Sequence, residues 1–418
     1  MSNTSTSSVR AKNKLIPELR FPEFAKSAEW EEFSLDSISP AIFDGTHQTP
    51  KYTIGGIPFF SVENLISKNK NKFISREDYL LATVKNKPER GDILITRIGN
   101  IGFSAVVDWD YEFSIYVTLA VVKKSNKFIP HYLNGYFQSD FYQKEIRSKS
   151  LLNAVPMKIN MDELRKTKVI LPPDKEKKEQ KKIASCLSSL DELIAAHNDK
   201  LEALKDHKKG LMQNLFPQDG KTVPKVRFPD FECDGEWGEK MLGDAADFIN
   251  GRAYKKEELL TSGKYRVLRV GNFFTNNEYY YSDLELDEDK YCDNGDLLYA
   301  WSASFGPRIW KEEKVIYHYH IWKVIEKKEI DKQFLYVLLD FETENIKAAQ
   351  ARGLGMQHLT KSGIESWESK IPPTKKEQQK IASCLSALDD LIKSQTEKIE
   401  QLQQHKKGLM QGLFPKIV

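Results

Sequence analysis

The chain has few cysteines and no long apolar run. Its four cysteines, Cys186, Cys233, Cys292 and Cys384, show no CxxC spacing, so the sequence predicts neither a zinc ribbon nor a disulfide framework. No apolar stretch approaches the ~20 residues that a membrane-spanning helix needs. The first twenty residues are polar and basic, without the apolar core of a secretory signal. We therefore expect a cytoplasmic protein with reduced cysteines.

Recognisable catalytic motifs are also missing. The chain has neither an Asn-Pro-Pro-aromatic segment nor a Gly-rich loop after a strand, both of which a methyltransferase would need. Gly220-Lys221-Thr222 resembles the end of a phosphate loop, but Leu215 stands where the first glycine belongs. His318 and His320 have no third ligand nearby in the sequence, which favours a structural role over metal binding. We expect no catalytic residue, no metal site and no cofactor in this chain.

A strong charge of one sign is absent as well. The net charge is +3 and the isoelectric point is near 8.3, which is below the pI of about 9 that would by itself indicate nucleic-acid binding. The balance is uneven, because residues 45–150 hold 15 Lys and Arg against 10 Asp and Glu, whereas residues 251–360 hold 16 against 18. Charge therefore favours the first half as a polyanion binder and leaves the second half undecided.

The sequence does contain one long repeat. Residues 179–217 return as residues 377–415 without a gap, and 26 of the 39 positions are identical. Apolar residues recur at steps of four and three in each copy, which is the heptad pattern of a helix that packs along a partner helix. About 35 residues at ~1.5 Å each would form a rod of roughly 50 Å. The simplest interpretation pairs the two copies within one chain; the alternative is two separate surface helices.

The predicted helix-pairing seam contains both apolar and polar residues. His197 and Lys208 are polar seam positions, and their counterparts Gln395 and Lys406 are polar too. Polar seam residues lower stability but can fix the register of two helices. The apolar residues predicted to pair the helices are Ile183, Leu187, Leu190, Ile194, Leu201, Leu204, Ile381, Leu385, Leu388, Ile392, Ile399 and Leu402.

The repeat covers a larger unit than the helix. Arg20-Phe21-Pro22, followed by Trp30, returns as Arg227-Phe228-Pro229, followed by Trp237, and a proline pair precedes each helix. The predicted segments are a disordered tail (1–18), a globular domain (19–173), a central helix (174–217), a second globular domain (218–373) and a C-terminal helix (374–418).

The globular segments diverge far more than the helices. Apolar runs bounded by turn residues predict strands in both, among them Tyr116–Val122 and Val315–Val324, and Pro130–Ser148 has a helical pattern. Because the helices are nearly identical and the globular segments are not, we expect the helices to share one task. The two globular domains then perform two different tasks.

Polar loop residues offer groups that can contact DNA bases. Loop 44–50 is rigid and rich in hydrogen-bond donors, and Arg97 and Asn100 follow a predicted strand. Arginine and asparagine can address guanine and adenine edges respectively, although ordinary turn chemistry remains the alternative for each residue. The predicted DNA-contacting residues are Thr46, His47, Gln48, Lys51, Arg97, Asn100, Arg252, Arg269, Asn272 and Arg308.

The order of domain, helix, domain, helix resembles the specificity subunits of type I restriction-modification enzymes. The resemblance runs from about Leu19 to Pro415 and is carried by the KIASCLSxLD and HKKGLMQxLFP segments of both helices, the RFPxF entries, the proline pairs and the DGTHQTP loop. It implies an α+β fold with two globular α/β target-recognition domains. It also implies that the two long helices form an intramolecular antiparallel coiled coil with pseudo-twofold symmetry.

The same resemblance implies a non-catalytic subunit that reads a bipartite, asymmetric site in double-stranded DNA. Its helices would set the spacing between the half-sites and dock two modification subunits, which recruit restriction subunits. S-adenosylmethionine, ATP and Mg²⁺ are then expected on the partner subunits. Two alternatives stay open: a self-sufficient restriction or modification enzyme, and a coiled-coil scaffold that binds only protein.

Overall fold

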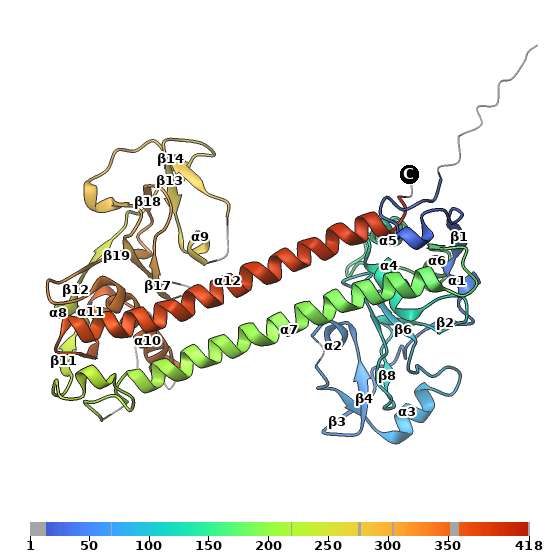
Figure 1. Cartoon of the computed structure of the whole chain (residues 1–418), viewed down its shortest axis with the longest axis horizontal. Helices are drawn as coiled ribbons and strands as arrows, with labels where there is room; N and C mark the ends of the chain where they lie inside the picture. The colour runs from blue at the N-terminus through green and yellow to red at the C-terminus, as the bar shows by residue number, and fades with distance from the viewer. Residues whose placement is uncertain are drawn as a thin grey trace, which may run out of the picture. The chain divides into compact units, whose positions relative to one another are not determined.

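The computed structural model describes residues 14–67, 69–218, 220–274, 277–302, 305–351 and 359–416. Residues 1–13 of the predicted N-terminal tail lie outside these ranges. The chain divides into two compact units, which are described separately: unit 1 comprises residues 1–198 and 397–418, and unit 2 comprises residues 199–396. Each unit therefore contains one globular domain and one end of each long helix (Figure 1).

The strands of unit 1 form two four-stranded sheets and one two-stranded sheet, in the orders β2-β9-β6-β7, β3-β5-β4-β8 and β1-β10. Among the paired strands of unit 1 that the structure describes, β4 and β8 are parallel and the other pairs are antiparallel. The strands are β1 (Glu31–Ser34), β2 (Ile42–Asp44), β3 (Tyr52–Thr53), β4 (Ile57–Phe60), β5 (Phe73–Ile74), β6 (Ile93–Thr96), β7 (Ser104–Val106), β8 (Ser114–Ile115), β9 (Leu119–Val122) and β10 (Lys168–Leu171).

Helices pack around these sheets and complete the unit. The predicted helix over Pro130–Ser148 is two helices, because the chain breaks at Ser139, whose side chain caps the second helix. The elements are η1 (Pro22–Phe24), α1 (Leu35–Ile38), α2 (Val62–Ser67), α3 (Arg76–Ala82), α4 (Pro130–Gln138), α5 (Asp140–Ser148), α6 (Met161–Arg165) and the long helix α7 (Lys178–Leu215).

Unit 2 repeats the same plan of three sheets, in the orders β12-β19-β16-β17, β14-β13-β18-β15 and β11-β20. Its strands are β11 (Gly238–Met241), β12 (Ala246–Asn250), β13 (Tyr265–Leu268), β14 (Tyr280–Ser282), β15 (Tyr291–Cys292), β16 (Leu297–Ala300), β17 (Gly306–Ile309), β18 (Val315–Tyr317), β19 (Ile321–Glu326) and β20 (Glu368–Ile371). Its helices are η2 (Pro229–Phe231), α8 (Leu242–Ala245), η3 (Lys256–Glu258), α9 (Val270–Phe274), η4 (Glu288–Lys290), α10 (Lys332–Ala351), α11 (Lys361–Glu365) and α12 (Lys375–Leu413).

The predicted strands Tyr116–Val122 and Val315–Val324 are wrong in one respect, because each contains a turn. In unit 1 the chain leaves β8, turns over residues 116–118 and enters β9 of the other sheet. In unit 2 it leaves β18, turns over residues 318–320 and enters β19. Apolar and aromatic residues run through both turns, so the sequence pattern does not mark the change of sheet. We call residues 116–118 and 318–320 the crossover turns.

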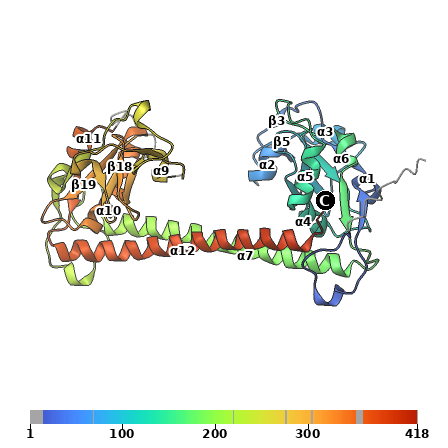
Figure 2. The same ribbon diagram turned by 90° about the horizontal axis from the view of Figure 1, so that it is seen from above.

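The ends of both long helices belong to the globular cores. In unit 1, Ile183 and Leu187 of α7 share a core with Met410, Leu413 and Phe414 near the end of α12. The two helices run antiparallel here, since the start of one lies with the end of the other (Figure 1, Figure 2). Phe414 contacts the rings of Trp30, Tyr132 and Tyr136 edge-on or nearly so. The helix pair and the domain therefore share one core.

Unit 2 builds the equivalent junction from the opposite helix ends. Ile381 and Leu385 of α12 share a core with Met212 and Leu215 of α7 and with Phe216, which follows α7. Phe216 stacks on the Phe341 ring of α10 at 4.5 Å between ring centroids. The structure and the repeat thus confirm the predicted fold class, two mixed domains joined by an antiparallel pair of long helices.

A buried ion pair explains the repeated Arg-Phe-Pro peptide. Arg20 donates two hydrogen bonds, 2.7 and 2.8 Å long, to the carboxylate of Glu179 in the first turn of α7. Arg227 makes the same pair with Glu377 in α12 at 2.7 and 2.8 Å. Both partners of each pair are almost fully buried, and a bidentate pair fixes orientation as well as distance. Each entry peptide is thereby fixed to the start of a long helix.

The shared core makes a testable prediction about stability. Leu187→Ala should lower the free energy of unfolding by about 2–5 kcal/mol, because it removes a buried side chain at the helix–domain junction. Leu187 is 3 % exposed, whereas Leu193 of the same helix is 43 % exposed. Leu193→Ala is therefore the matched control and should change stability by less than about 0.5 kcal/mol. Urea unfolding followed by circular dichroism checks both; equal losses would contradict the shared core.

Candidate nucleic-acid interface

Three segments of unit 1 are joined beside its crossover turn. Loop 44–51 contacts turn 116–118 through a parallel β-bridge between Thr46 and Tyr116. Turn 97–100, which follows β6, donates a 2.9 Å backbone hydrogen bond to the crossover turn. We call these three segments the unit 1 platform. Hydrogen bonds thus join the backbones of the three segments that carry its exposed side chains.

Unit 2 builds the same backbone arrangement. Loop 250–254 contacts turn 318–320 through a parallel bridge between Arg252 and His318. The amide of Trp301, which follows β16, donates to the carbonyl of His320 at 3.1 Å. We call loop 250–254, turn 318–320 and Trp301 the unit 2 platform. It has the topology of the unit 1 platform but carries different side chains.

A glycine permits the close approach in each platform. A Cβ atom on Gly45 would lie 2.0 Å from the carbonyl oxygen of Ile115, and one on Gly251 would lie 2.4 Å from that of Tyr317. Such distances exclude any larger residue unless the backbone moves. The Asp-Gly-Thr and Asn-Gly-Arg sequences are therefore equivalent docking points of the two loops.

The unit 1 platform presents several of the predicted DNA-contacting side chains. Gln48, Lys51 and Asn100 are exposed, and the His47 side chain is 73 % exposed while its ring lies 3.1 Å from Asp44. Thr46 is half-buried and donates its hydroxyl to the carbonyl of Gln48 at 3.2 Å. The platform thus combines an amide, an imidazole and an ammonium group on one loop. Thr46 itself supports the loop conformation.

Arg97, which we predicted to contact DNA, is largely buried. Its side chain is 9 % exposed, and Nη1 donates to Asp44 at 2.8 Å and to the carbonyl of Val117 at 3.0 Å. Burial lowers the pKa of the Arg97 guanidinium, and the Asp44 carboxylate opposes this shift. Arg97 therefore connects the loop and the crossover turn to the end of its own strand. Little of its side chain is accessible to solvent.

Two predicted residues of unit 2 lie at or beside its platform. Arg252 makes a bidentate ion pair with Glu258, with distances of 2.8 and 3.0 Å, and lies over the Tyr254 ring. Arg269 is exposed, with its guanidinium 5.0 Å from the centroid of the Tyr280 ring. Stacking on a tyrosine holds a guanidinium in place without neutralising it.

Asn272 and Arg308 lie apart from the platform. Asn272 is buried; its side chain accepts from the amide of Arg269 and donates to the carbonyl of Glu278. Asn64 holds the equivalent turn of unit 1 by the same kind of contacts, so Asn272 has a structural role. Arg308 is exposed, donates to the carbonyl of Phe273 and lies over the Phe273 ring.

Sequence reasoning missed an aromatic cluster on the unit 2 platform. Trp301, His318, Tyr319 and His320 contact one another, and Tyr319 is 38 % exposed. Burial lowers the pKa of His318 to about 4, with smaller contributions from His320 and Arg269, and burial also lowers the pKa of His320. Both rings are therefore neutral at neutral pH. The His-Tyr-His sequence was interpreted as part of a strand, so the turn at residues 318–320 was not predicted.

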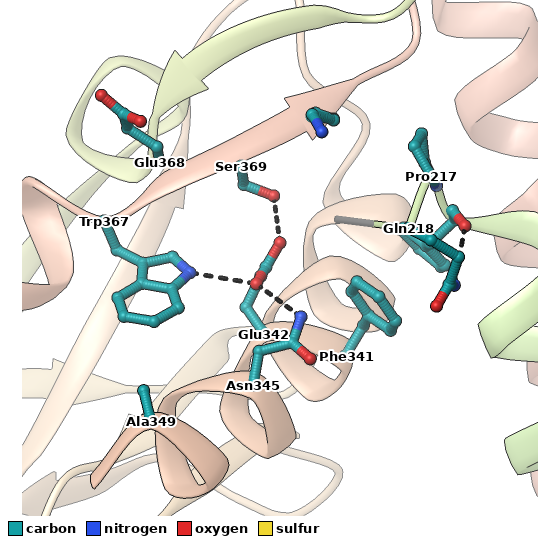
Figure 3. Close-up of a pocket in the computed structure, with 11 residues that line it drawn as sticks. Pro217, Gln218, Phe341, Glu342, Asn345, Ala349, Trp367, Glu368 and Ser369 are labelled. Atoms are coloured by element: carbon teal, nitrogen blue, oxygen red, sulfur yellow. Dashed lines mark hydrogen bonds between the residues drawn. The ribbon is translucent and has the colours of Figure 1, made fainter. Parts of the chain in front are cut away.

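A cavity of about 230 Å³ lies at another place in unit 2, between α10, β20 and the end of α7. Glu342 points into it and is 6 % exposed (Figure 3). Its carboxylate accepts hydrogen bonds from Trp367 and Asn345, each 3.0 Å long, and from the hydroxyl of Ser369. These contacts use the carboxylate to join helix and strand, so Glu342 is part of the domain's framework.

The described residues include no group of three or more His, Cys, Asp or Glu side chains that could hold a metal ion. Within the same ranges, no helix is both long and apolar enough to cross a membrane.

The residues predicted to pair the long helices fall into two groups by burial. The buried ones lie mostly near the globular domains: Ile183, Leu187, Ile381, Leu385, Ile399 and Leu402. The half-buried ones are Leu190, Ile194, Leu201, Leu204, Leu388 and Ile392. Of the buried residues, Ile183, Leu187, Ile381 and Leu385 also contact a globular core. Which of the twelve pair the helices directly stays a prediction.

Comparison with known proteins identifies relatives along nearly the whole chain. The family model of the type I restriction modification DNA specificity domain matches residues 27–206 and again residues 234–404. The type I restriction enzyme MjaX specificity subunit of Methanocaldococcus jannaschii is 30 % identical over 407 residues, covering 92 % of this chain and 93 % of that protein.

Solved structures share the fold. The type I restriction-modification S subunit from M. genitalium superposes with a TM-score of 0.60 at 17 % identity, covering 96 % of this chain and all of that one. A chain from a structure of type I R-M complex assembly and conformational transition gives a TM-score of 0.55 at 15 % identity, covering 93 % and 98 %.

The setting of Arg97 predicts a loss of stability when it is removed. Arg97→Ala should lower the free energy of unfolding by about 1–3 kcal/mol, because it removes the donor to the Val117 carbonyl and the arginine partner of Asp44, which keeps only its contact with His47. Gln48→Ala, on the same platform but exposed, should change stability by less than about 0.5 kcal/mol. Thermal and urea unfolding of the two variants provide the measurement. An Arg97 variant as stable as the Gln48 variant would show that the ion pair does not hold the platform.

Proposed function

The chain belongs to the type I restriction-modification specificity subunits, which are non-catalytic DNA-recognition components with two tandem target-recognition domains, and from this premise we propose that each platform reads one half of a bipartite DNA site. The unit 1 platform reads one half and the unit 2 platform reads the other. Because their side chains differ, the site is asymmetric.

One observation carries this proposal: the two platforms repeat a backbone but not its side chains. Thr46 and Arg252 occupy the same bridge position, and Tyr116 and His318 are their partners. A repeated framework with different exposed groups is what two readers of different sequences require. Framework residues must keep their geometry, whereas the groups that contact base edges must vary with the bases.

The exposed groups have suitable chemistry. The Gln48 amide can pair with both N6 and N7 of adenine. On the unit 2 platform, Glu258 occupies both Nη groups of Arg252, and Tyr319 presents an exposed ring and hydroxyl. Lys51 and Arg269 are exposed cations beside these groups and serve to contact phosphates, which position a protein without selecting a sequence. The small net charge of the chain is compatible with this role if the partner subunits supply further phosphate contacts.

The repeated helices are the proposed docking surface for two modification subunits. Leu193 and Leu391 are exposed by 43 % and 53 %, and they occupy equivalent positions of α7 and α12. Small residues flank them on the same helix face: Ser189 and Ala196 in one copy, and Ala387 and Ser394 in the other. A partner that must bind twice needs a surface that occurs twice, and the helices provide one.

The remaining partner chemistry follows from this docking. The modification subunits would bind S-adenosylmethionine and methylate adenine, and they would recruit restriction subunits that use ATP and Mg²⁺. The complex would act in the cytoplasm on double-stranded DNA. This chain then contributes recognition and spacing, and no reacting group.

Half-site readout can be tested by mapping methylated adenines. The wild-type complex with its modification subunit should methylate one bipartite motif in genomic DNA. Gln48→Ala should relax only one half of that motif, and Tyr319→Ala only the other, by about 1–3 kcal/mol per base pair. Lys26→Ala, an exposed residue outside both platforms, is the control and should leave the motif unchanged.

Two outcomes would contradict this assignment. A wild-type complex that is active but methylates no bipartite motif would remove the function itself. If Gln48→Ala and Tyr319→Ala altered the same half, or altered neither, the platforms would not be the reading surfaces, although the chain could still determine specificity elsewhere.

The docking surface gives a second prediction, measured as stoichiometry. Leu193→Glu should remove one modification subunit from the complex, Leu391→Glu the other, and the double variant both, because a buried charge without a partner opposes association. Native mass spectrometry or light scattering counts the bound subunits. Ile54→Glu alters a fully exposed apolar residue of unit 1 and should bind normally. Unchanged stoichiometry in the double variant would exclude these leucines from the interface.

A further inference from the structure

Two lysines lie inside the pairing region of the long helices. Lys208 of α7 and Lys406 of α12 occupy equivalent positions of the repeat, and their side chains are only 13 % and 15 % exposed. An ammonium group loses much of its hydration when it is buried, and this cost must be offset by nearby acceptors. The partners of these two lysines therefore define where each helix can lie.

In unit 2, Lys208 connects three helices. Its ammonium lies 2.7 Å from Asp389 of α12 and 3.0 Å from Asp340 of α10. Lys208 belongs to α7, so a single side chain joins both long helices to a helix of the globular domain. Burial lowers the pKa of Lys208, but Asp340 and Asp389 outweigh it and the pKa is raised, so the lysine is charged throughout the neutral range.

Unit 1 contains the reciprocal arrangement. The Lys406 ammonium of α12 lies 2.6 Å from Asp191 of α7 and 3.4 Å from the side-chain oxygen of Gln138 in α4. Asp191 and Asp389 are equivalent residues of the repeat, as are the two lysines. Each copy thus supplies a lysine to the other copy's aspartate, and each lysine also reaches the neighbouring domain.

Such a contact specifies position more than it adds stability. A buried ion pair often stabilises a protein no better than apolar residues of similar size, whereas removing one partner is strongly destabilising. Sliding one helix along the other by a heptad would separate each lysine from its aspartate and leave two largely buried ammonium groups without these partners. The apolar seam alone would tolerate that shift, because leucine and isoleucine recur every seven residues.

We propose that Lys208 and Lys406 are positioning residues that fix the register of the two long helices and the seat of each globular domain on them. They thereby determine how many base pairs the subunit accepts between its two half-sites. This inference rests on the proposed reading of a bipartite site, and it assigns the choice of spacing to two contacts rather than to helix length alone.

The two contacts are not equal, and this gives the proposal a graded test. Lys208 has two carboxylate partners, whereas Lys406 has one carboxylate and one amide. An ammonium group is held more strongly by a carboxylate than by a neutral amide oxygen, because both partners of the first contact are charged. Removing Lys208 should therefore relax the spacing more than removing Lys406.

The experiment measures methylation of a DNA panel by the full complex. The DNAs carry the native half-sites with the native spacer and with spacers one base pair shorter or longer. For Lys208→Met, methylation of the altered spacers relative to the native one should rise by about tenfold, as expected when a buried contact that selects one register is lost. Lys209→Met, which changes the exposed neighbouring lysine, should keep the wild-type ratio.

A second variant covers the case in which Lys208→Met does not fold. Lys208→Met combined with Asp340→Leu and Asp389→Leu replaces the whole cluster by apolar residues, which restores packing without restoring a charge that selects the register. In this variant, methylation of the altered spacers relative to the native one should rise. Lys208→Arg should keep the wild-type ratio. The ratio is informative because a purely structural defect lowers methylation of every spacer alike.

Each outcome has one interpretation. If the folded apolar variant kept the wild-type ratio, or if Lys208→Met lowered methylation of all spacers equally, Lys208 would not determine spacing. If the wild-type complex showed no preference for any spacer, the proposed bipartite reading itself would fail. If methylation of the altered spacers relative to the native one rose in Lys208→Met but not in Lys209→Met, both the spacing role of Lys208 and the bipartite reading would be supported.

Discussion

The rest of the structure depends on one packing constraint: the end of each long helix is part of a globular core. Leu187 belongs to α7 and Phe414 directly follows α12, yet they pack in one core with α4. Neither the helix pair nor the domain can bury its apolar surface without the other at this junction. A change in how the helices pair is therefore transmitted to the domain, which is what a protein that measures spacing on DNA requires.

Polar contacts then select one arrangement among those that the apolar seam permits. The Arg20–Glu179 and Arg227–Glu377 pairs fix each entry peptide to the start of a helix, and Lys208 and Lys406 connect the helices to each other. The arginine and lysine side chains of these contacts are largely buried and charged, so a misplaced helix would leave a cation without its partner. Apolar packing supplies the stability, and these ion pairs supply the specificity of assembly.

The sequence predicts the helices well because their signal is local and long. Heptad spacing over more than thirty residues, repeated 198 positions later, is sufficient to place both helices and favours pairing them. The strands next to the crossover turns were less predictable, because aromatic and β-branched residues continue through the turns. Whether such a run turns depends on its pairing with strands far along the chain, which no local pattern records.

The candidate site was predictable at the level of loops but not of individual roles. Gln48 and His47 are exposed as expected, whereas Arg97 is buried against Asp44, a residue 53 positions earlier. Asn272 could have been recognised as structural by aligning it with Asn64, which holds the corresponding turn. Comparing the two domains of the chain thus distinguishes residues that hold the backbone from residues that could contact bases. Residue type alone does this less well, because only the residues that hold the backbone must be kept in both domains.

The distribution of differences along the helix repeat follows from the same constraint. Residues 195–199 all differ between the copies, whereas residues 182–188 and 207–213 are all identical. The identical segments include Ile183, Leu187 and Met212, which lie in the globular cores, and Lys208, which contacts two other helices. The variable segment lies midway along the helix, where the chain passes from one unit to the other. Side-chain identity is thus retained where a helix meets a domain, and the middle of the helix contributes mainly its length.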